Sequence, residues 1–514
     1  MALGLDTSAF VDQGQQYLKG LAAAHRAELQ ALELLDSHYQ GVQPLSYMHP
    51  ELLMRLGDRM RQVVVAWPEL VISSIEERLD VEGFRLGGEA EADERLWSFW
   101  QANGLDVGSH QAHVDSLVMK RSYIVVGTRG PADVDPSSGV DQDVPLITWQ
   151  SPLETYAARD PRTRRVMSAA TWWDDQPLGG GPVTKKAALY LPGSTSWWRM
   201  DGGAWVLDED STEGVDEHRL GIVPVVPLVN RPRTSHRSSS MCEGWSDLEP
   251  VIPLSDAACK AATDMMVTAE YHAFPRRVVI GAKQEDFVDA AGNPISAFSS
   301  VMGQLWGVED PDAKVLQFPE SSLSNYHDTI KLLAQLVASV TGLPPHYLGS
   351  ATDNPASADA IRSSEARLVC RAERKQRALG EGWEQVMRIA LLVADGEVPP
   401  NVRSMETVWR DASTPTIAQS ADAAVKLYAG GVVPRRQIWE DLGYSAVQQD
   451  RMQEEFDREA QRAAASFGLG PDPQMPGDAA ALAAAEGAAV GEPAATQTAR
   501  VTYTTAAQAA PVPA

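Results

Sequence analysis

The chain has 514 residues, of which 44% are hydrophobic and 22% charged, a composition typical of a globular protein long enough to bury several cores. Its formal net charge is −25. A protein that held DNA tightly would carry an excess of lysine and arginine, because the release of counterions from phosphate supplies most of that affinity. The charge therefore disfavours tight DNA binding.

The cysteines and the N-terminal sequence bear on the compartment. The three cysteines, Cys242, Cys259 and Cys370, are far apart and support neither a disulfide framework nor a CxxC zinc site. The first residues lack a basic segment followed by a long apolar one, and no stretch reaches about 18 uninterrupted apolar residues. We therefore expect synthesis in a reducing cytosol, without secretion and without a membrane span.

The first part of the chain mixes helical and strand patterns. Leucines at helical spacings predict a helix over residues 12–39. Shorter helices are expected over 67–79 and 92–101, and the β-rich run at 123–127 predicts a strand. An α/β region therefore begins before residue 130.

Residues 146–229 predict a small antiparallel sheet, because short β-branched and aromatic runs alternate with Gly, Pro and Asp turns. The expected strand runs are 146–149, 169–173, 187–191 and 197–206. The last strand, 222–229, contains Pro224 and Pro227, which cannot donate to a ladder and therefore favour the edge of the sheet.

Two further helices are expected, separated by an excursion. Residues 246–273 repeat modest side chains at spacings of three and four, namely Leu254, Ala258, Ala261, Met265, Thr268 and His272. Residues 324–341 repeat the seam with Ile330, Leu333, Val337 and Val340, and end at a Gly and two prolines, 342–345. Such seams favour close packing against neighbouring helices over a thick core. Strand-like pieces at 277–281 and 314–318 lie between the two helices.

A long helix is expected after the loop 343–354. Asn354 is suited to the N-cap and Pro355 to the first helical position, and the pattern continues to about Asp395. Such a helix is roughly 60 Å long, and Gly380 with Gly382 predicts a kink. Residues 415–462 predict two or three helices split by Gly430-Gly431 and Gly443, and the Ala-, Gly- and Pro-rich sequence beyond Ser466 predicts disorder.

Motifs of catalysis and metal binding are missing. The sequence has no P-loop, GxGxxG after a strand, GxSxG, HExxH or EF-hand loop, and the nearest P-loop candidate, 179–186, is interpreted as a turn. His110 and His113 share a helix face but have no further ligands at fixed spacing, so they are interpreted as surface or capping residues. The acidic run 89–94 is interpreted as a solvated face. We expect no enzyme activity, no cofactor and no metal.

Two basic clusters contrast with the acidic background. The first contains Arg231, Arg233, His236 and Arg237. The second, on the long helix, contains Arg362, Arg367, Arg371, Arg374, Lys375 and Arg377 beside only Glu365 and Glu373. Two interpretations stay open: these residues pair with acidic neighbours in the same or an adjacent subunit, or they contact DNA.

Two sets of short motifs follow one another along the chain, most clearly between Trp245 and Asp395. The first comprises Asn230-Arg231, GWSDLEPVI from Gly244 to Ile252, Asp256-Ala257, Asp264-Met265, FPRR from Phe274 to Arg277, and Gly281. The second comprises TGLP from Thr341 to Pro344, Leu348-Gly349, Asn354-Pro355, SADAIR from Ser357 to Arg362, Glu365, Gln376 and Trp383. In this order the pieces resemble the portal proteins of tailed bacteriophages, and weaker similarity reaches ERLDVEGF from Glu77 to Phe84.

The resemblance implies an α+β, predominantly helical portal fold with a wing, stem, clip and crown, repeated twelve times around a channel. The implied parts are wing 1–240, stem helices 241–273 and 324–341, clip 274–323, tunnel loop 342–355, wing-spine helix 356–399, crown 400–465 and disordered tail 466–514.

The resemblance also implies a structural role: a ring at one capsid vertex that admits and releases double-stranded DNA. The implied partners are the terminase large subunit, head–tail adaptors, and the major capsid and scaffolding proteins, and the site is the virion after assembly in the host cytoplasm. Hydrolysis would belong to the terminase, which agrees with the missing P-loop. The alternative is another capsid-associated or adaptor protein, although adaptors are usually shorter.

The resemblance places candidate residues in three groups. Tunnel-loop candidates are His346, Tyr347, Ser350, Thr352 and Asp353. Candidates for docking at the clip are Arg276 and Arg277. Candidates for contact with DNA or with another subunit are Arg231, Arg233, Arg371, Arg374 and Lys375.

Overall fold

The computed structural model contains both helices and sheets and forms two compact units, Met1–Ser413 and Thr414–Ala514. This agrees with the predicted α+β class. The structure describes residues 7–44, 63–89, 91–130, 133–134, 139–176, 180–208, 214–232, 244–273, 277–280, 314–317, 322–349, 358–413, 424–442, 444 and 446–466.

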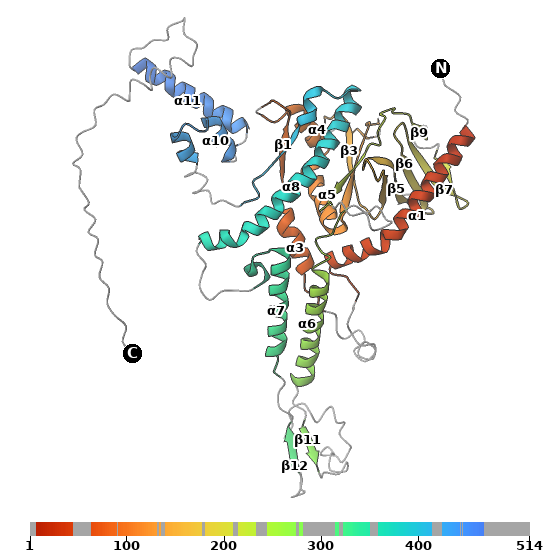
Figure 1. Ribbon diagram of the computed structural model, residues 1–514, viewed down its shortest axis with the longest axis vertical. Helices are drawn as coiled ribbons and strands as arrows, with labels where there is room; N and C mark the ends of the chain where they lie inside the picture. Colours follow the sequence, from red (N-terminus) through yellow and green to blue (C-terminus); the bar gives the residue numbers. More distant parts are fainter. Residues whose placement is uncertain are drawn as a thin grey trace, which may run out of the picture. The chain divides into compact units, whose positions relative to one another are not determined.

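The described helices of the first unit include the predicted ones, in the expected order, and a further helix over residues 105–119 that is not predicted from the sequence (Figure 1). They are α1 (Thr7–Tyr39), α3 (Trp67–Glu76), α4 (Glu94–Ala102), α5 (Leu105–Met119), α6 (Ile252–Ala273), α7 (Ser324–Thr341) and α8 (Ala358–Asp395), with the short 3-10 helices η4 (Pro345–Leu348) and η5 (Pro400–Ser404). The predicted bounds of α7 are confirmed, because Gly342 ends the helix in a left-handed conformation with φ 75°.

The described residues form two sheets of three or more strands. The larger has the order β4-β5-β6-β7-β8, with β9 paired to β7. Its strands are β4 (Thr155–Arg159), β5 (Val166–Asp175), β6 (Thr184–Tyr190), β7 (Thr195–Asp201), β8 (Ala204–Leu207) and β9 (Val215–Asp216). The predicted run 197–206 is therefore wrong as one strand, because Gly202 and Gly203, with φ 54° and 86°, turn the chain between β7 and β8. Helix α1 packs on this sheet, where an added Cβ at Gly14 would overlap the ring of Trp198.

The smaller sheet has the order β10-β2-β3, made by β10 (Val225–Val229), β2 (Arg121–Gly127) and β3 (Leu146–Gln150). The proline-containing strand lies at a sheet edge, as predicted, with Pro227 opposite Tyr123. The prediction of a single sheet over residues 146–229 is wrong, because β3 and β10 both pair with β2 and not with the strands of the larger sheet. Two strand pairs complete the unit: β1 (Val81–Arg85) with β13 (Glu406–Trp409), and β11 (Arg277–Ile280) with β12 (Lys314–Gln317).

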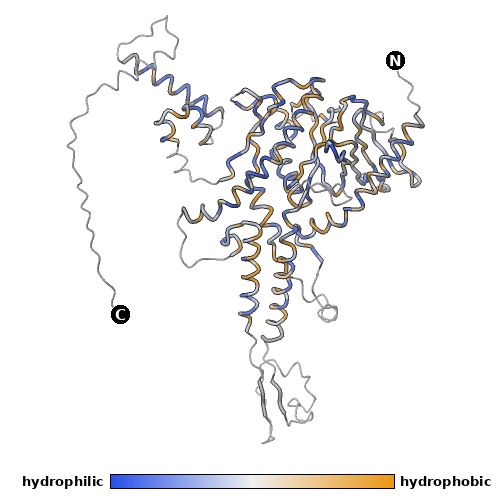
Figure 2. The backbone as a smooth tube through the Cα atoms, viewed as in Figure 1, coloured by the Kyte–Doolittle hydropathy of each residue, from blue (hydrophilic) through white to orange (hydrophobic). Residues whose placement is uncertain are grey.

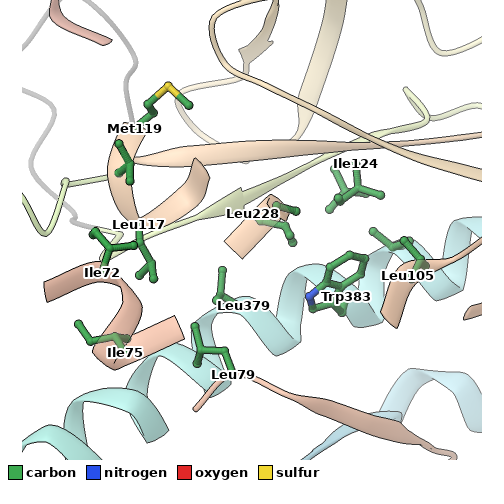
Figure 3. Close-up of a cluster of buried hydrophobic side chains, with 14 of the residues drawn as sticks. Ile72, Ile75, Leu79, Leu105, Leu117, Met119, Ile124, Leu228, Leu379 and Trp383 are labelled. Carbon is green, nitrogen blue, oxygen red and sulfur yellow. The ribbon is translucent and has the colours of Figure 1, made fainter. Parts of the chain in front are cut away.

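Helix α8 contributes the centre of the largest hydrophobic core. Leu379 and Trp383 point from α8 towards Leu79, Ile124 and Leu228 (Figure 3). The helix is continuous through Gly380 and Gly382. These glycines allow close approach, because an added Cβ at Gly382 would overlap Leu228 and one at Gly380 would lie 3.2 Å from Trp409 Nε1.

His113 lies inside this core, so its interpretation as a surface or capping residue is wrong. It is fully buried, and Trp383 Nε1 donates to its Nε2 at 2.8 Å. Burial, together with the charge of His110, lowers the pKa of His113 to about 3. His110 forms ion pairs with Glu76 and, at 3.3 Å, with Asp80. The sequence around His113 does not reveal this burial, because the indole that binds its ring belongs to α8, 270 positions away.

Helix α6 begins at Ile252, later than the predicted residue 246. Residues 246–251 instead form a turn that is held by hydrogen bonds. Ser246 Oγ accepts from Leu248 N, and Asp247 N donates to Leu117 O at 3.1 Å. The predicted N-cap Asn354, with Pro355, lies outside the described residues, as do Gly443 and the predicted disorder beyond residue 466.

The second unit contains α10 (Arg435–Asp441) and α11 (Ala446–Ser466), preceded by a helical segment at 424–429. The predicted break at Gly430-Gly431 is confirmed, with Gly431 at φ 63°. Trp439 stacks on Phe456 with ring centroids 5.6 Å apart, and Arg435 lies over the Phe456 ring at 4.3 Å. Aromatic contacts therefore join α10 to α11.

Candidate functional site

Helices α6 and α7 lie side by side and run antiparallel (Figure 1). Thr268 Oγ1, near the end of α6, is 3.3 Å from the hydroxyl of Tyr326, near the start of α7. The first half of α6 is fixed to residues 63–65, because Ser255 Oγ donates to Val65 O at 3.2 Å and Val65 N donates to Cys259 Sγ at 3.2 Å. The pair is therefore anchored at the end where α6 begins.

Of the predicted seam residues, Ala258 and Val337 are buried. The others are half-buried or exposed, and the side chain of His272 lies outside the described residues. The buried side of α7 consists of Ala334, Val337, Ala338 and Thr341, and that of α6 includes Ser255, Ala258, Cys259, Ala262 and Thr263. The prediction that Val340 belongs to the buried seam is wrong, because its side chain is 46% exposed. It lies on the other side of α7, since the burial pattern follows positions 334, 337, 338 and 341.

Val340 belongs instead to an exposed apolar row that we term the α7 stripe. Leu332, Leu336 and Val340 are 56%, 43% and 46% exposed and follow one another at intervals of four residues, so they share a helix face. On α6, Met266 is 48% exposed. Figure 2 shows α7 turning from a hydrophilic start to an apolar second half. Within the described chain, none of these four side chains belongs to a hydrophobic core.

The turn after α7 is tied to α8. Gly342 passes so close to Arg367 that an added Cβ would lie 2.9 Å from Arg367 Cδ, and Arg367 Nη1 donates to Ser339 O at 2.9 Å. In η4, the Tyr347 hydroxyl donates to Glu365 Oε1 at 3.1 Å and accepts from Arg78 Nη2 at 3.5 Å. The end of α7 and the following turn are thus held by the first half of α8.

The tunnel-loop candidates fall into two groups. His346 is exposed and its ring meets that of Tyr347 edge-on, with centroids 4.8 Å apart, whereas Tyr347 is half-buried. Ser350, Thr352 and Asp353 lie outside the described residues. A role for the first two in a channel stays a prediction.

A buried ionic cluster joins β10, the turn before α6, and α8. We term it the Asp247 cluster: Asn230, Arg231, Asp247, Arg371 and Lys375. Asp247 Oδ1 accepts from Arg371 at 3.1 Å and from Arg231 at 3.5 Å. Asp247 Oδ2 accepts from Asn230 Nδ2 at 3.1 Å and from Lys375 Nζ, which also donates to Asn230 Oδ1.

The electrostatics of the cluster follow from its burial. Burial alone would raise the pKa of Asp247, but Lys375 and Arg371 outweigh it and hold that pKa below its usual value. Burial lowers the pKa of Lys375 to about 8, although Asp247 acts in the opposite direction. Burial and the nearby Arg231 also lower the pKa of Arg371, again against the effect of Asp247. The cluster therefore holds more positive than negative charge in a partly dehydrated place.

Several predicted contact residues are thus brought together, and others are not. Arg231, Arg371 and Lys375 meet at one carboxylate of their own chain, which agrees with intrachain pairing, and their contact with DNA or another subunit stays a prediction. Arg374 is exposed and takes part in none of the ion pairs found in the described part of the chain. Arg233, Arg237, His236 and Arg276 lie outside that part, and so does the side chain of Arg277 in β11.

Asn230 and Asp247 have no role assigned from sequence. Both belong to the quoted motifs, but Asp247 is 128 positions from Lys375, so only the fold brings them together. Among the residues described, no group of three His, Cys, Asp or Glu side chains is arranged to hold a metal ion. In the same ranges, no helix combines the length and apolarity needed to span a membrane.

Comparisons with known proteins agree on one family. Residues 18–465 match the family described as phage portal protein, SPP1 Gp6-like. The chain is 40% identical over 419 residues to the portal protein of Mycobacterium phage D29, which covers 80% of this chain and 83% of that protein. It is 39% identical over 420 residues to the portal protein of Mycobacterium phage L5, with the same coverage of 80% and 83%.

Proposed function

The chain belongs to the family of phage portal proteins, SPP1 Gp6-like, and from this membership we propose that it forms a closed ring whose channel admits and releases double-stranded DNA. It is a portal subunit and hence a structural component of a virion. The alternative of a different capsid-associated or adaptor protein is set aside, since the match extends over residues 18–465.

The α7 stripe is the observation that best supports ring formation. A monomer leaves Leu332, Leu336 and Val340 in water, and burying such side chains is worth about 25 cal/mol per Å² of apolar surface. Their partner in the proposed ring is the next subunit's α6, since antiparallel pairs standing side by side meet through α6 on one side and α7 on the other. This contact is heterologous, and such contacts close into rings.

We assign the parts of the chain to the regions of a portal. The assignment is wing 1–240, stem 241–273 and 324–341, clip 274–323, tunnel loop 342–355, wing spine 356–399, crown 400–465 and a disordered tail 466–514. It is supported by the antiparallel pair α6 and α7 with the strand pair β11 and β12 between them in sequence, and by the 38-residue helix α8.

The proposed tunnel loop begins in an anchored turn. Tyr347 is tied to Glu365 and Arg78, whereas His346 is exposed. In this proposal, His346 with Ser350, Thr352 and Asp353 lies along the DNA path, while Tyr347 fixes the start of the loop to α8. A net charge of −25 per subunit limits adhesion of the DNA to the ring.

The proposed partners follow the same assignment. The clip, with Arg276 and Arg277, would dock the terminase large subunit during packaging and the head–tail adaptors afterwards. The wing would face the major capsid and scaffolding proteins. Assembly would take place in the host cytoplasm, and the ring would remain at one vertex of the capsid.

Replacing two leucines of the α7 stripe tests this proposal. The double variant Leu332→Asn, Leu336→Asn should fold but should lose rings at concentrations where the unchanged chain forms them, because the new amide groups would be buried at the contact. Mass photometry measures the species present. Val107→Asn, which alters a valine that is 66% exposed on α5, is the matched control and should leave rings intact. Equal ring formation by the double variant would refute the stem contact.

A further inference from the structure

The Asp247 cluster contains more cationic groups than its one carboxylate can neutralise. Lys375, Arg371 and Arg231 all contact Asp247, so three positive charges face one negative charge. Lys375 and Asp247 are the most deeply buried pair, with side chains 6% and 0% exposed. They neutralise one another, which leaves the two guanidinium groups in excess.

A third arginine extends the excess charge along α8. Arg367 lies one turn before Arg371 on the helix, and its charge contributes to the lowered pKa of Arg371. Arg367 donates a hydrogen bond to a backbone carbonyl, Ser339 O, and this contact does not neutralise its charge. We term Arg231, Arg367 and Arg371 the arginine face.

Three acidic side chains of the described residues that lie close in sequence to the cluster have other partners. Glu249, two residues after Asp247, pairs with Lys120 at 3.1 Å, and Glu373 lies 3.8 Å from Arg377. Glu365 accepts from Tyr347. The ion pairs of the described residues therefore supply the arginine face with Asp247 alone.

Arg371 is the least hydrated member of the arginine face, whereas Arg231 and Arg367 are exposed. The side chain of Arg371 is 20% exposed and that of Arg231 is 47% exposed, and each guanidinium has five N–H donors in a planar fork suited to carboxylates. A partly buried guanidinium that shares one carboxylate has lost hydration without full compensation. A further carboxylate beside Arg371 would compensate for the hydration that its guanidinium has lost.

The position of the face identifies the donor of that carboxylate. Arg367 binds the backbone of Ser339, which is flanked by Val340, and Leu336 lies one turn earlier on α7. The arginine face thus continues from the α7 stripe. A second copy of the chain is also strongly acidic, with 69 Asp and Glu against 44 Lys and Arg. DNA is the weaker candidate, because the same net charge repels it.

We infer that the arginine face receives one or more carboxylates of the neighbouring subunit and so completes an ionic contact when the ring closes. This inference rests on the proposed ring and adds the chemistry of one subunit contact. It makes ring formation sensitive to salt, since a contact between charges at the rim of an interface is screened.

Charge reversal provides the first test. The double variant Arg231→Glu, Arg367→Glu leaves Arg371, Lys375 and Asp247 in place and should raise the subunit concentration at which half the chains are in rings at least tenfold at low salt. Sedimentation velocity measures that concentration, and circular dichroism checks the fold. Arg377→Glu, on the same helix and 79% exposed, is the control and should shift it far less. The inference would be overturned if that concentration rose equally in the two variants, or did not change in the double variant.

A charge-preserving variant provides the second test and identifies the partner group. Arg367→Lys keeps the positive charge and introduces an amine that a carbodiimide links to a touching carboxylate. Rings of this variant should give a cross-link between subunits, which mass spectrometry locates on an Asp or Glu. Isotopically mixed rings distinguish a link between subunits from one within a subunit. Intact rings with no link between subunits would overturn the inference.

The two proposals fail in different ways. If the unchanged chain forms no rings, the proposed function fails. If the unchanged chain and the reversal variant form rings equally well, only the arginine face is refuted. If the reversal variant forms normal rings but loses contact with DNA in a filter-binding assay, the partner is phosphate, and the assignment to a second copy is wrong.

Discussion

Asp247 holds three separate parts of the chain together through one buried carboxylate. It contacts Arg231 after β10, Arg371 and Lys375 on α8, and through its own backbone it binds Leu117 at the end of α5. A carboxylate with a side chain 0% exposed depends entirely on these partners, and they depend on it.

Removing the charge of Asp247 should therefore destabilise the fold. Asp247→Asn leaves Lys375 and Arg371 buried without a counter-charge, and we expect a loss of about 3 kcal/mol in the free energy of unfolding. Chemical denaturation of the full chain at neutral pH measures it. Glu397→Gln, at an exposed position, is the control, and an equally small effect of both changes would contradict the account.

His113 should make stability depend on pH. Its folded-state pKa of about 3 lies below the ordinary value of 6.5, so only the unfolded chain gains a proton as the pH falls through 6.5. The stability that the neutral ring contributes is present above about pH 6.5 and should decrease by roughly 3 kcal/mol by about pH 4.5. His113→Gln keeps an acceptor for Trp383 and should abolish this decrease. Denaturation curves of both proteins at the two pH values measure the change in the free energy of unfolding. An equal decrease in the free energy of unfolding in the variant and the unchanged chain would contradict the prediction.

The cluster and the histidine also mark the limit of sequence reasoning. The basic residues on α8 are visible in the sequence, and pairing with acidic neighbours is one of the interpretations that the sequence leaves open. Their carboxylate is not identifiable, because Asp247 precedes Lys375 by 128 positions in a turn with no charge pattern of its own. His113 is equally hidden, since its indole partner on α8 is 270 positions away.

At the scale of helices and strands, local signals decide which boundaries can be predicted. Gly342 followed by prolines fixes the end of α7, and Pro224 with Pro227 indicates an edge strand, because these residues act on their own backbone. The start of α6 is predicted too early, because the tertiary contacts of Asp247 hold residues 246–251 in a turn that is not helical. The exposed side of α7 is misjudged at Val340, since apolar residues occur on both faces.

Two helical glycines should respond to substitution in opposite directions. At Gly20, in α1, an added Cβ meets nothing within 4 Å, so Gly20→Ala should stabilise the protein by about 1 kcal/mol through helix propensity. At Gly382 the added Cβ would overlap Leu228 of β10, so Gly382→Ala should destabilise it by about 1–3 kcal/mol despite the same propensity gain. Thermal unfolding compares them. Stabilisation by both would show that α8 and β10 are not in close contact.

For the whole molecule, charge sets the expected behaviour towards DNA. With a net charge of −25 per subunit, the ring should bind linear double-stranded DNA with a dissociation constant weaker than about 1 μM at about 0.15 M salt. Fluorescence anisotropy with a labelled duplex measures this. Nanomolar binding at that salt concentration would contradict the idea that DNA slides without adhering.

The central claim is that this chain, like other portal proteins, works as a ring around a channel. Its apolar α7 stripe and its arginine face are surfaces that a monomer leaves incomplete and a ring would cover. Negative-stain electron microscopy of the purified full chain tests this most directly. We predict closed rings of about twelve subunits with a central hole, formed through one repeated contact. A uniform population of monomers at every protein and salt concentration tried would contradict it.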